Sequence, residues 1–188
     1  MNNTVNKDKR MEFVKKLDRH ILKVDMIVYQ DETNFNMSEG WSRIGERAVV
    51  HLPPSQRKNL HVQGGVSALS GVLLLRTHEG SIAKNENARF IVDLFVAAQR
   101  TEGYPELSPT NKIVVVTDNA PARSGVEDLA RELLVADGVM NGSRLVLLWL
   151  GPYSPMLNPI EGCWNVLKAH MQRYMTNDHQ KTRTTGAR

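Results

Sequence analysis

Leu145-Val-Leu-Leu-Trp-Leu-Gly-Pro-Tyr-Ser-Pro-Met-Leu-Asn-Pro-Ile-Glu161 contains the transition that decides the fold. Its first six residues form an apolar run, which predicts a buried strand. A loop with three prolines follows, and Ile160 and Glu161 then begin an amphipathic helix. A buried strand, a stiff loop and a helix in this order predict an α/β fold, in which helices pack against a sheet.

Glu161 has two interpretations that the local sequence does not separate. Asn158, Pro159 and Glu161 fit the Ncap, N1 and N3 positions of a helix, where a proline loses no hydrogen bond. Glutamate at N3 can also accept a hydrogen bond from the backbone of the cap residue, so it is a common capping residue. The same position would hold a metal ligand in a fixed orientation. Acidic residues elsewhere in the chain must therefore decide between a helix cap and a metal ligand.

Up to Leu150, the chain predicts three strands, a helix, a fourth strand, a second helix and a fifth strand. Strands are expected at 24–30, 60–69, 71–78, 112–117 and 144–150, and the two intervening helices at 85–101 and 125–137. Glycine near Ser70-Gly71 predicts a hairpin, so the first three strands should form an antiparallel meander. The β-branched run from Lys112 to Thr117 predicts a strand that is buried on both faces.

Acidic residues follow three of these strands. Asp31 and Asp118 come directly after the first and fourth strands, and Glu161 begins the helix after the fifth. Adjacent residues of a strand point to opposite faces, so Asp31 and Glu32 cannot both serve one site if the strand continues through them. Neighbouring strands would bring the three carboxylates to one edge of a mixed sheet, where hard oxygen ligands suit Mg²⁺ or Mn²⁺. Two such ions catalyse phosphodiester displacement.

Composition is that of one globular domain without membrane spans. The 188 residues are 41% hydrophobic and 23% charged. No apolar run reaches the roughly 18 residues of a membrane span, and the N-terminus lacks the apolar core of a signal peptide. We therefore expect no membrane association and no secretion, with an address in the nucleus of a eukaryote or in the cytoplasm and nucleoid of a bacterium. The single cysteine, Cys163, excludes an intrachain disulfide and a thiolate zinc cluster.

Basic residues gather at both ends of the chain. Residues 1–24 predict a basic helix or linker, whose outer face is either solvated or turned toward DNA. Residues 175–188 lack apolar periodicity and predict a basic, disordered tail. The main domain is therefore expected at 25–174. A net charge of +4 and a pI near 9.3 permit a polyanionic partner.

Three blocks resemble the catalytic domain of DDE-type transposases of the mariner superfamily, including their bacterial insertion-sequence relatives. They are Gln30-Asp-Glu-Thr33, Val116-Thr-Asp-Asn-Ala-Pro121 and Pro152-Tyr-Ser-Pro-Met-Leu-Asn-Pro-Ile-Glu161. The last block is highly specific, and the similarity runs from about Asp25 to Lys168. The resemblance implies a ribonuclease H-like fold and a metal-dependent DNA endonuclease and strand transferase, which acts in DNA transposition on transposon ends and target DNA.

The resemblance also implies roles for individual residues. Asp31, Asp118 and Glu161 would hold two Mg²⁺ or Mn²⁺ ions as the catalytic triad, which favours Asp31 over Glu32. Further residues are candidates for contact with DNA or for supporting the triad: Asn119, Arg123, Asn165 and Lys168. Helical spacing places Asn165 and Lys168 on one polar stripe with Glu161, where Lys168 is either near a phosphate or solvated. The segment 35–59, with Trp41 and Arg43, would pair two subunits in a homodimer.

Two departures from the family pattern keep alternatives open. Arg123 stands where the family usually has histidine, which replaces an imidazole with a fixed positive charge. Only about 24 residues stand before the first strand in this sequence, which is too short for a paired helix-turn-helix domain there, so we expect none within them. One alternative is therefore an inactive, truncated or domesticated fragment that binds DNA or protein without cutting. Another is a ribonuclease H-like nuclease that acts on RNA–DNA hybrids.

Overall fold

A five-stranded mixed sheet forms the centre of the protein. The structure is a computed structural model that describes residues 3–35, 60–118 and 125–185. The strand order is β3-β2-β1-β4-β5, in which β1, β2 and β3 are antiparallel, whereas β4 and β5 run parallel to β1. The strands are β1 (Met26–Phe35), β2 (Leu60–Ser67), β3 (Gly71–Glu79), β4 (Ile113–Thr117) and β5 (Leu145–Trp149). The predicted meander with two further strands is confirmed.

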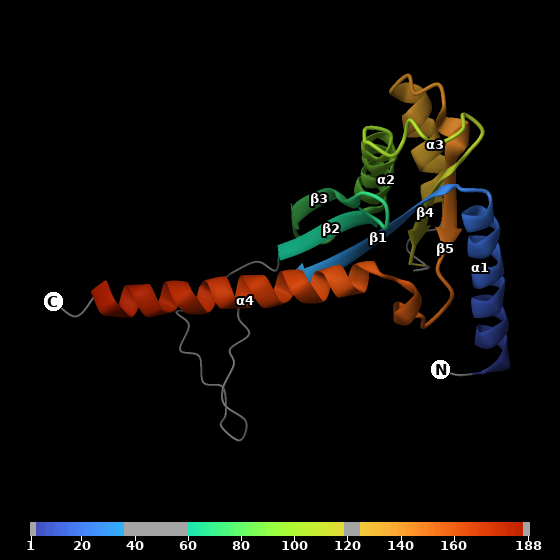
Figure 1. Ribbon diagram of the computed structural model, residues 1–188. Coiled ribbons are helices and arrows are strands. Elements are labelled where there is room, and N and C mark those ends of the chain that lie inside the picture. Colours follow the sequence, from blue (N-terminus) through green and yellow to red (C-terminus); the bar gives the residue numbers. More distant parts are fainter. Residues whose placement is uncertain (1–2, 36–59, 119–124, 186–188) are drawn as a thin grey trace.

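Within the described residues, four α-helices cover the two faces of this sheet (Figure 1). They are α1 (Thr4–Leu22), α2 (Lys84–Ala98), α3 (Val126–Ala136) and α4 (Ile160–Thr185). The helices α2 and α3 share one hydrophobic core with one face of the sheet, and α1 and α4 pack on the opposite face. None of the described helices is long and apolar enough to cross a membrane.

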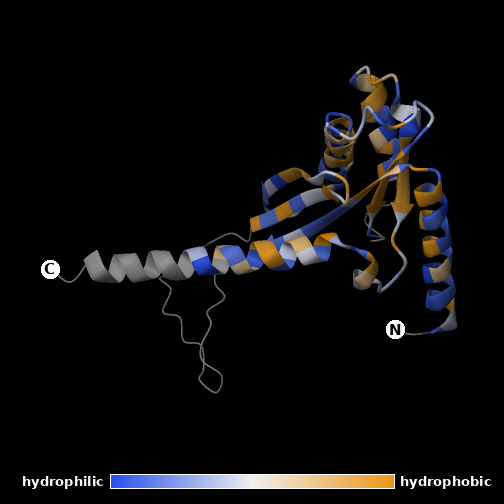
Figure 2. Cartoon of the chain, in the orientation of Figure 1, coloured by the Kyte–Doolittle hydropathy of each residue, from blue (hydrophilic) through white to orange (hydrophobic). Residues whose placement is uncertain are grey.

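The predicted two-sided burial of β4 is confirmed, because all five of its residues are buried. Ile113 and Val115 belong to the core under α2 and α3, while Val114 and Val116 contact the cluster around Phe13 of α1. Apolar residues therefore follow one another without alternation along β4 and β5, which Figure 2 shows as mostly orange arrows. This burial fixes which face each residue of β4 occupies.

The first strand is longer than predicted. It begins at Met26 rather than Val24, because Val24 takes a left-handed backbone conformation with φ of 59° between α1 and the strand. It continues to Phe35, because β2 offers an antiparallel partner to every residue from Val28 to Phe35. Asp31 consequently lies within a strand and not at its end. The parallel pairing of β1 with β4, in contrast, runs only from Met26 to Tyr29.

Trp164 fixes α4 on the sheet. The predicted apolar stripe of this helix is confirmed, since Ile160 and Trp164 are buried and Leu167 and Met171 pack beside them. Gly64 of β2 permits the contact, because a Cβ atom there would lie 2.4 Å from the indole ring of Trp164. The close packing sets the direction in which α4 leaves the sheet, and with it the position of Glu161 in the first turn.

The segment after Tyr174 is helical, whereas the sequence predicts a disordered tail from residue 175. The backbone of α4 continues to Thr185 and projects well past the sheet (Figure 1). No glycine or proline occurs between Cys163 and Thr185, so nothing in the backbone chemistry ends the helix earlier. The prediction relied on missing apolar periodicity, which reports packing and not the helical state itself.

A buried carboxylate joins α1 to the start of β4. The Asp25 side chain is 3% exposed, and its Oδ2 lies 2.7 Å from Nδ1 of His20. Its Oδ1 accepts a hydrogen bond of 2.7 Å from the backbone N–H of Lys112. Burial alone would raise the pKa of Asp25, but the hydrogen bonds from Lys112 and His20 together lower it below its ordinary value.

We expect Asp25→Asn to destabilise the protein near neutral pH by about 1–3 kcal/mol, because the buried partners lose a charged acceptor. A lowered folded-state pKa contributes stability above the unfolded pKa, and this contribution is lost as the pH falls through the folded value. The difference between the two proteins should therefore shrink below about pH 4. Urea unfolding at a series of pH values measures this difference in the free energy of unfolding, and Asp18→Asn, at an exposed position, is the control. A difference that does not change with pH would contradict the assignment.

Candidate active site

Asp31 and Asp118 occupy neighbouring positions on the central strands. The parallel register pairs Tyr29 with Val116, and the Oγ1 of Thr117 donates a hydrogen bond to Oε1 of Gln30. The pairing of β1 with β4 ends at Tyr29 and Val116; if its register is continued by two residues, Asp31 would come opposite Asp118. Tyr29 and Val116 both face α1, so the two aspartates, each two residues further on, lie on that same face. Asp31 is half-buried and Asp118 is exposed.

Asn158 connects this pair to Glu161. Its Nδ2 donates a hydrogen bond of 3.2 Å to Oδ2 of Asp31, and its backbone carbonyl accepts one of 3.1 Å from the N–H of Glu161. Asn158 is 5% exposed, so this contact is shielded from water. One residue thus holds the carboxylate of β1 and the first turn of α4 in a fixed relation.

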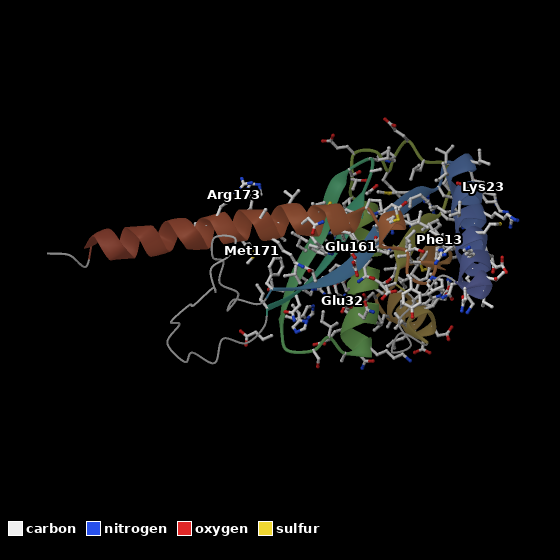
Figure 3. All side chains as sticks on the ribbon, turned by 90° about the horizontal axis from the view of Figure 1, so that it is seen from below. Phe13, Lys23, Glu32, Glu161, Met171 and Arg173 are labelled. Atoms are coloured by element: carbon white, nitrogen blue, oxygen red, sulfur yellow. The ribbon has the colours of Figure 1, made fainter. Side chains whose placement is uncertain are left out.

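Glu161 is exposed in the first turn of α4 (Figure 3), and it does not form the predicted capping box. The backbone N–H of Asn158, which the glutamate would have to bind, donates instead to the carbonyl of Pro155 at 3.0 Å. The Asn158 side chain binds Asp31 instead of capping the helix. Glu161 makes no side-chain hydrogen bond or ion pair with any other residue that the structure describes. The capping interpretation is therefore wrong for its side chain.

Glu32 points away from this group of residues. Its Oε1 accepts a hydrogen bond of 3.4 Å from Nε2 of Gln63, which also contacts Asn87 of α2. Glu32 therefore faces the side of α2, while Asp31 faces the side of α4. The predicted alternation of the two acids is confirmed, and the choice of Asp31 as the metal ligand stays a prediction.

The chemistry of the donors fits a hard divalent cation, although their side chains do not form a closed cluster. Within residues 3–35, 60–118 and 125–185, no three acidic, histidine or cysteine side chains are close enough to hold a metal ion. Asn158 ties Glu161 to Asp31, and Asp118 directly follows β4, the strand next to β1. Oδ1 of Asn158 is buried without a hydrogen-bond partner among the described residues. An oxygen of this kind, beside carboxylates, suits Mg²⁺ or Mn²⁺.

The other predicted site residues divide into two groups. Asn165 and Lys168 lie one and two turns after Glu161 on α4, and Asn165 is exposed. Lys168 is half-buried, with its Nζ 5.9 Å from the centre of the Phe35 ring, so it is partly held by a cation–π contact. Asn119, Arg123 and the predicted pairing segment with Trp41 and Arg43 lie outside the described residues, except for Phe35 itself.

Sequence reasoning missed three residues that build this site. Gln30 and Thr117 tie β1 to β4 one position before each aspartate, and both are buried. Each of them is a polar residue at the end of an otherwise apolar predicted strand, and this pattern could have identified them as residues that join the strands near the site. Asn158 was recognised only as a helix cap, because its partner, Asp31, lies 127 positions away in the chain. No local pattern identifies such a partner.

Comparisons with known proteins agree with this architecture. The family profile described as DDE superfamily endonuclease matches residues 26–183. The solved catalytic domain of Mos1 mariner transposase is 16% identical, with a TM-score of 0.59 over 100% of this chain and 84% of that chain. This likeness confirms the predicted ribonuclease H-like fold. A search of curated proteins found no significant match.

Longer Mos1 chains give the same likeness. The Mos1 transposase paired-end complex with left transposon end is 16% identical, with a TM-score of 0.59 over 100% of this chain and 56% of that chain. The Mos1 mariner paired end complex with Mn is 19% identical, with a TM-score of 0.56 over 85% of this chain and 46% of that chain. The chain thus spans about half the length of the transposase in these complexes.

Proposed function

Since this chain belongs to the DDE superfamily endonucleases, we propose that it is the catalytic domain of a mariner-type transposase, which cleaves DNA and joins its strands. The observation that supports the proposal is the parallel pairing of β1 with β4, whose register, continued by two residues, would bring Asp31 opposite Asp118 on the face of the sheet where α4 packs. Asn158 links this pair to Glu161. These contacts support the assignment of three carboxylates, far apart in the sequence, to one metal site.

Asp31, Asp118 and Glu161 would hold two divalent ions. Metal ions held there would supply the activation of a water or a 3′-hydroxyl and the stabilisation of the leaving oxygen of the phosphodiester. The protein itself supplies fixed positions for the ligands: Asn158 orients Asp31, and the packing of Trp164 orients the first turn of α4. The exposed carboxylates of Asp118 and Glu161 leave the site open to a long substrate. The solved relative with Mn supports the choice of Mg²⁺ or Mn²⁺.

DNA is the proposed substrate, as transposon end and as target. The relative solved with a transposon end supports this choice. Asn165, which is exposed, and Lys168, which is half-buried, follow Glu161 along α4, where a duplex that reaches the carboxylates would pass. Arg123 and Asn119 remain candidates for contacts beside Asp118, and the segment 35–59 remains the candidate for homodimer pairing. The corresponding address is the nucleus or the bacterial nucleoid.

Nicking of supercoiled plasmid DNA tests the proposed function. We expect nicking with Mn²⁺, loss of nicking after EDTA treatment and recovery when excess Mn²⁺ is added, because the carboxylates need the ions to act. Calorimetric titration should show Mn²⁺ binding that Asp118→Ala abolishes. Equal Mn²⁺ binding by Asp118→Ala would contradict the metal site. DNA binding without any nicking would instead support the fragment that binds without cutting, and a preference for RNA–DNA hybrids would support the other nuclease.

A further inference from the structure

The N-terminal helix contacts the loop that leads to Glu161. Nη1 of Arg10 in α1 donates a hydrogen bond of 3.3 Å to the backbone carbonyl of Pro152. The two residues are 142 positions apart, and Arg10 is half-buried at this contact. Oγ of Ser154 donates to the same carbonyl at 3.2 Å. The beginning of the loop is therefore held by a charged side chain from another element.

The backbones of the helix and the loop also approach closely. Gly151 is buried against α1, and a Cβ atom at this position would lie 2.9 Å from both Cα and Cγ of Arg10. Only glycine permits this approach without a shift of the helix or the loop. The hydrogen bond from Arg10 to Pro152 is thus part of a closely packed contact between α1 and the loop.

Packing fixes α1 itself at the end of β5. Phe13, one turn after Arg10, is 3% exposed and belongs to the cluster of Leu148 and Leu150. Leu150 immediately precedes the loop, and its N–H donates a hydrogen bond of 2.8 Å to the carbonyl of Thr117 on β4. Arg10 therefore contacts the loop from a helix that is packed against the strands next to it, including β4, which Asp118 directly follows.

We propose that α1 positions the catalytic carboxylates, with Arg10 as a positioning residue that acts through the loop from Gly151 to Pro159. Arg10 holds the start of this loop, and Asn158 holds its end against Asp31. Pro152, Pro155 and Pro159 limit the freedom of the backbone along this loop. Release of either anchor lets Glu161 move relative to the aspartates.

This inference rests on the proposed function, but it concerns a part of the chain that the family profile does not match. The profile begins at residue 26, whereas α1 ends at Leu22. The sequence alone suggested only a solvated or DNA-facing basic helix. The contacts of Arg10 and Phe13 instead make α1 a structural element of the active site. A displacement of about 1 Å at a catalytic group is enough to cost roughly 100-fold in rate.

The test compares Arg10→Ala with Lys9→Ala, an exposed neighbour of the same charge on the same helix. We expect Arg10→Ala to lower the maximal nicking rate about tenfold at saturating Mn²⁺, with the KM for DNA little changed, because the site is misplaced while the substrate surface remains. Arg10→Lys should recover part of the rate, since its ammonium can still donate to Pro152. Lys9→Ala should keep the maximal rate of the unaltered protein.

Amide hydrogen exchange at residues 153–162 provides a readout that does not need activity. We expect faster exchange in Arg10→Ala, and in Gly151→Ala, which disturbs the same contact from the loop side, but not in Lys9→Ala. Unchanged exchange in both variants would overturn the proposal, as would an equal loss of rate in Lys9→Ala. A protein that neither nicks DNA nor binds Mn²⁺ would refute the proposed function, and the exchange experiment would still decide the positioning by α1.

Discussion

Glu161→Gln is expected to lower metal-dependent DNA nicking by at least about 100-fold while it leaves the thermal unfolding temperature nearly unchanged. Glutamine keeps the size of glutamate but removes the negative charge, and its neutral amide oxygen is a much weaker ligand for a divalent ion than a carboxylate. The folded state loses little, because the Glu161 side chain is exposed and forms no hydrogen bond or ion pair with the other described residues. A residue that capped α4 would show the opposite pattern, with lower stability and retained nicking.

Plasmid nicking with Mn²⁺ and thermal unfolding followed by circular dichroism measure the two effects of this change. Glu132→Gln is a matched control, because Glu132 is likewise exposed on a helix but belongs to α3, which covers the opposite face of the sheet. The control should retain both nicking and stability. Activity of Glu161→Gln within a few-fold of the unaltered protein would exclude Glu161 from the metal site.

The adjacent acids Asp31 and Glu32 should respond in opposite ways to loss of charge. We expect Asp31→Asn to lower nicking by roughly 100-fold or more, because its carboxylate accepts a hydrogen bond from Asn158 on the face of the sheet that carries the proposed metal site. Glu32→Gln should stay within a few-fold, because its carboxylate contacts Gln63 on the other face of the sheet. The two substitutions are the same chemical change one residue apart, so each is the control of the other.

Single-turnover nicking rates and calorimetric Mn²⁺ titration separate these two variants. Asp31→Asn should lose Mn²⁺ binding together with activity, and Glu32→Gln should keep both. Loss of Mn²⁺ binding in Glu32→Gln with full binding in Asp31→Asn would assign the site to the face of α2. The experiment therefore decides which face of the sheet carries the catalysis.

Local chemistry was sufficient to predict much of this fold. The β-branched residues of β4 identified a strand buried on both faces, and Gly71, whose φ of 69° suits glycine, marked the hairpin between β2 and β3. The apolar spacing from Ile160 to Met171 identified the packed side of α4. In each case the information lies within a few residues of the chain, where side-chain period and backbone preference act directly.

Properties that depend on distant partners were predicted less well. The extension of β1 past Gln30 depends on pairing with β2, and the contact of Arg10 depends on where the loop after β5 returns to α1. Asn158 is the clearest example of a local preference that a distant partner overrides. Its local sequence has the chemistry of a helix cap, but a tertiary hydrogen bond to Asp31 takes its side chain instead. The blocks that resemble the transposase family supplied the grouping of the acids, which local patterns could not.

The burial of β4 on both faces also limits how this site can change over evolutionary time. Insertion or deletion of one residue within Ile113–Thr117 would exchange the side chains that enter the two cores and would turn the position of Asp118 away from that of Asp31. Changes of length are therefore tolerated only in the connections between elements, such as the one that joins α2 to β4. Homologous chains can accordingly differ in the number of residues between their two aspartates while the distance between these residues in space stays the same.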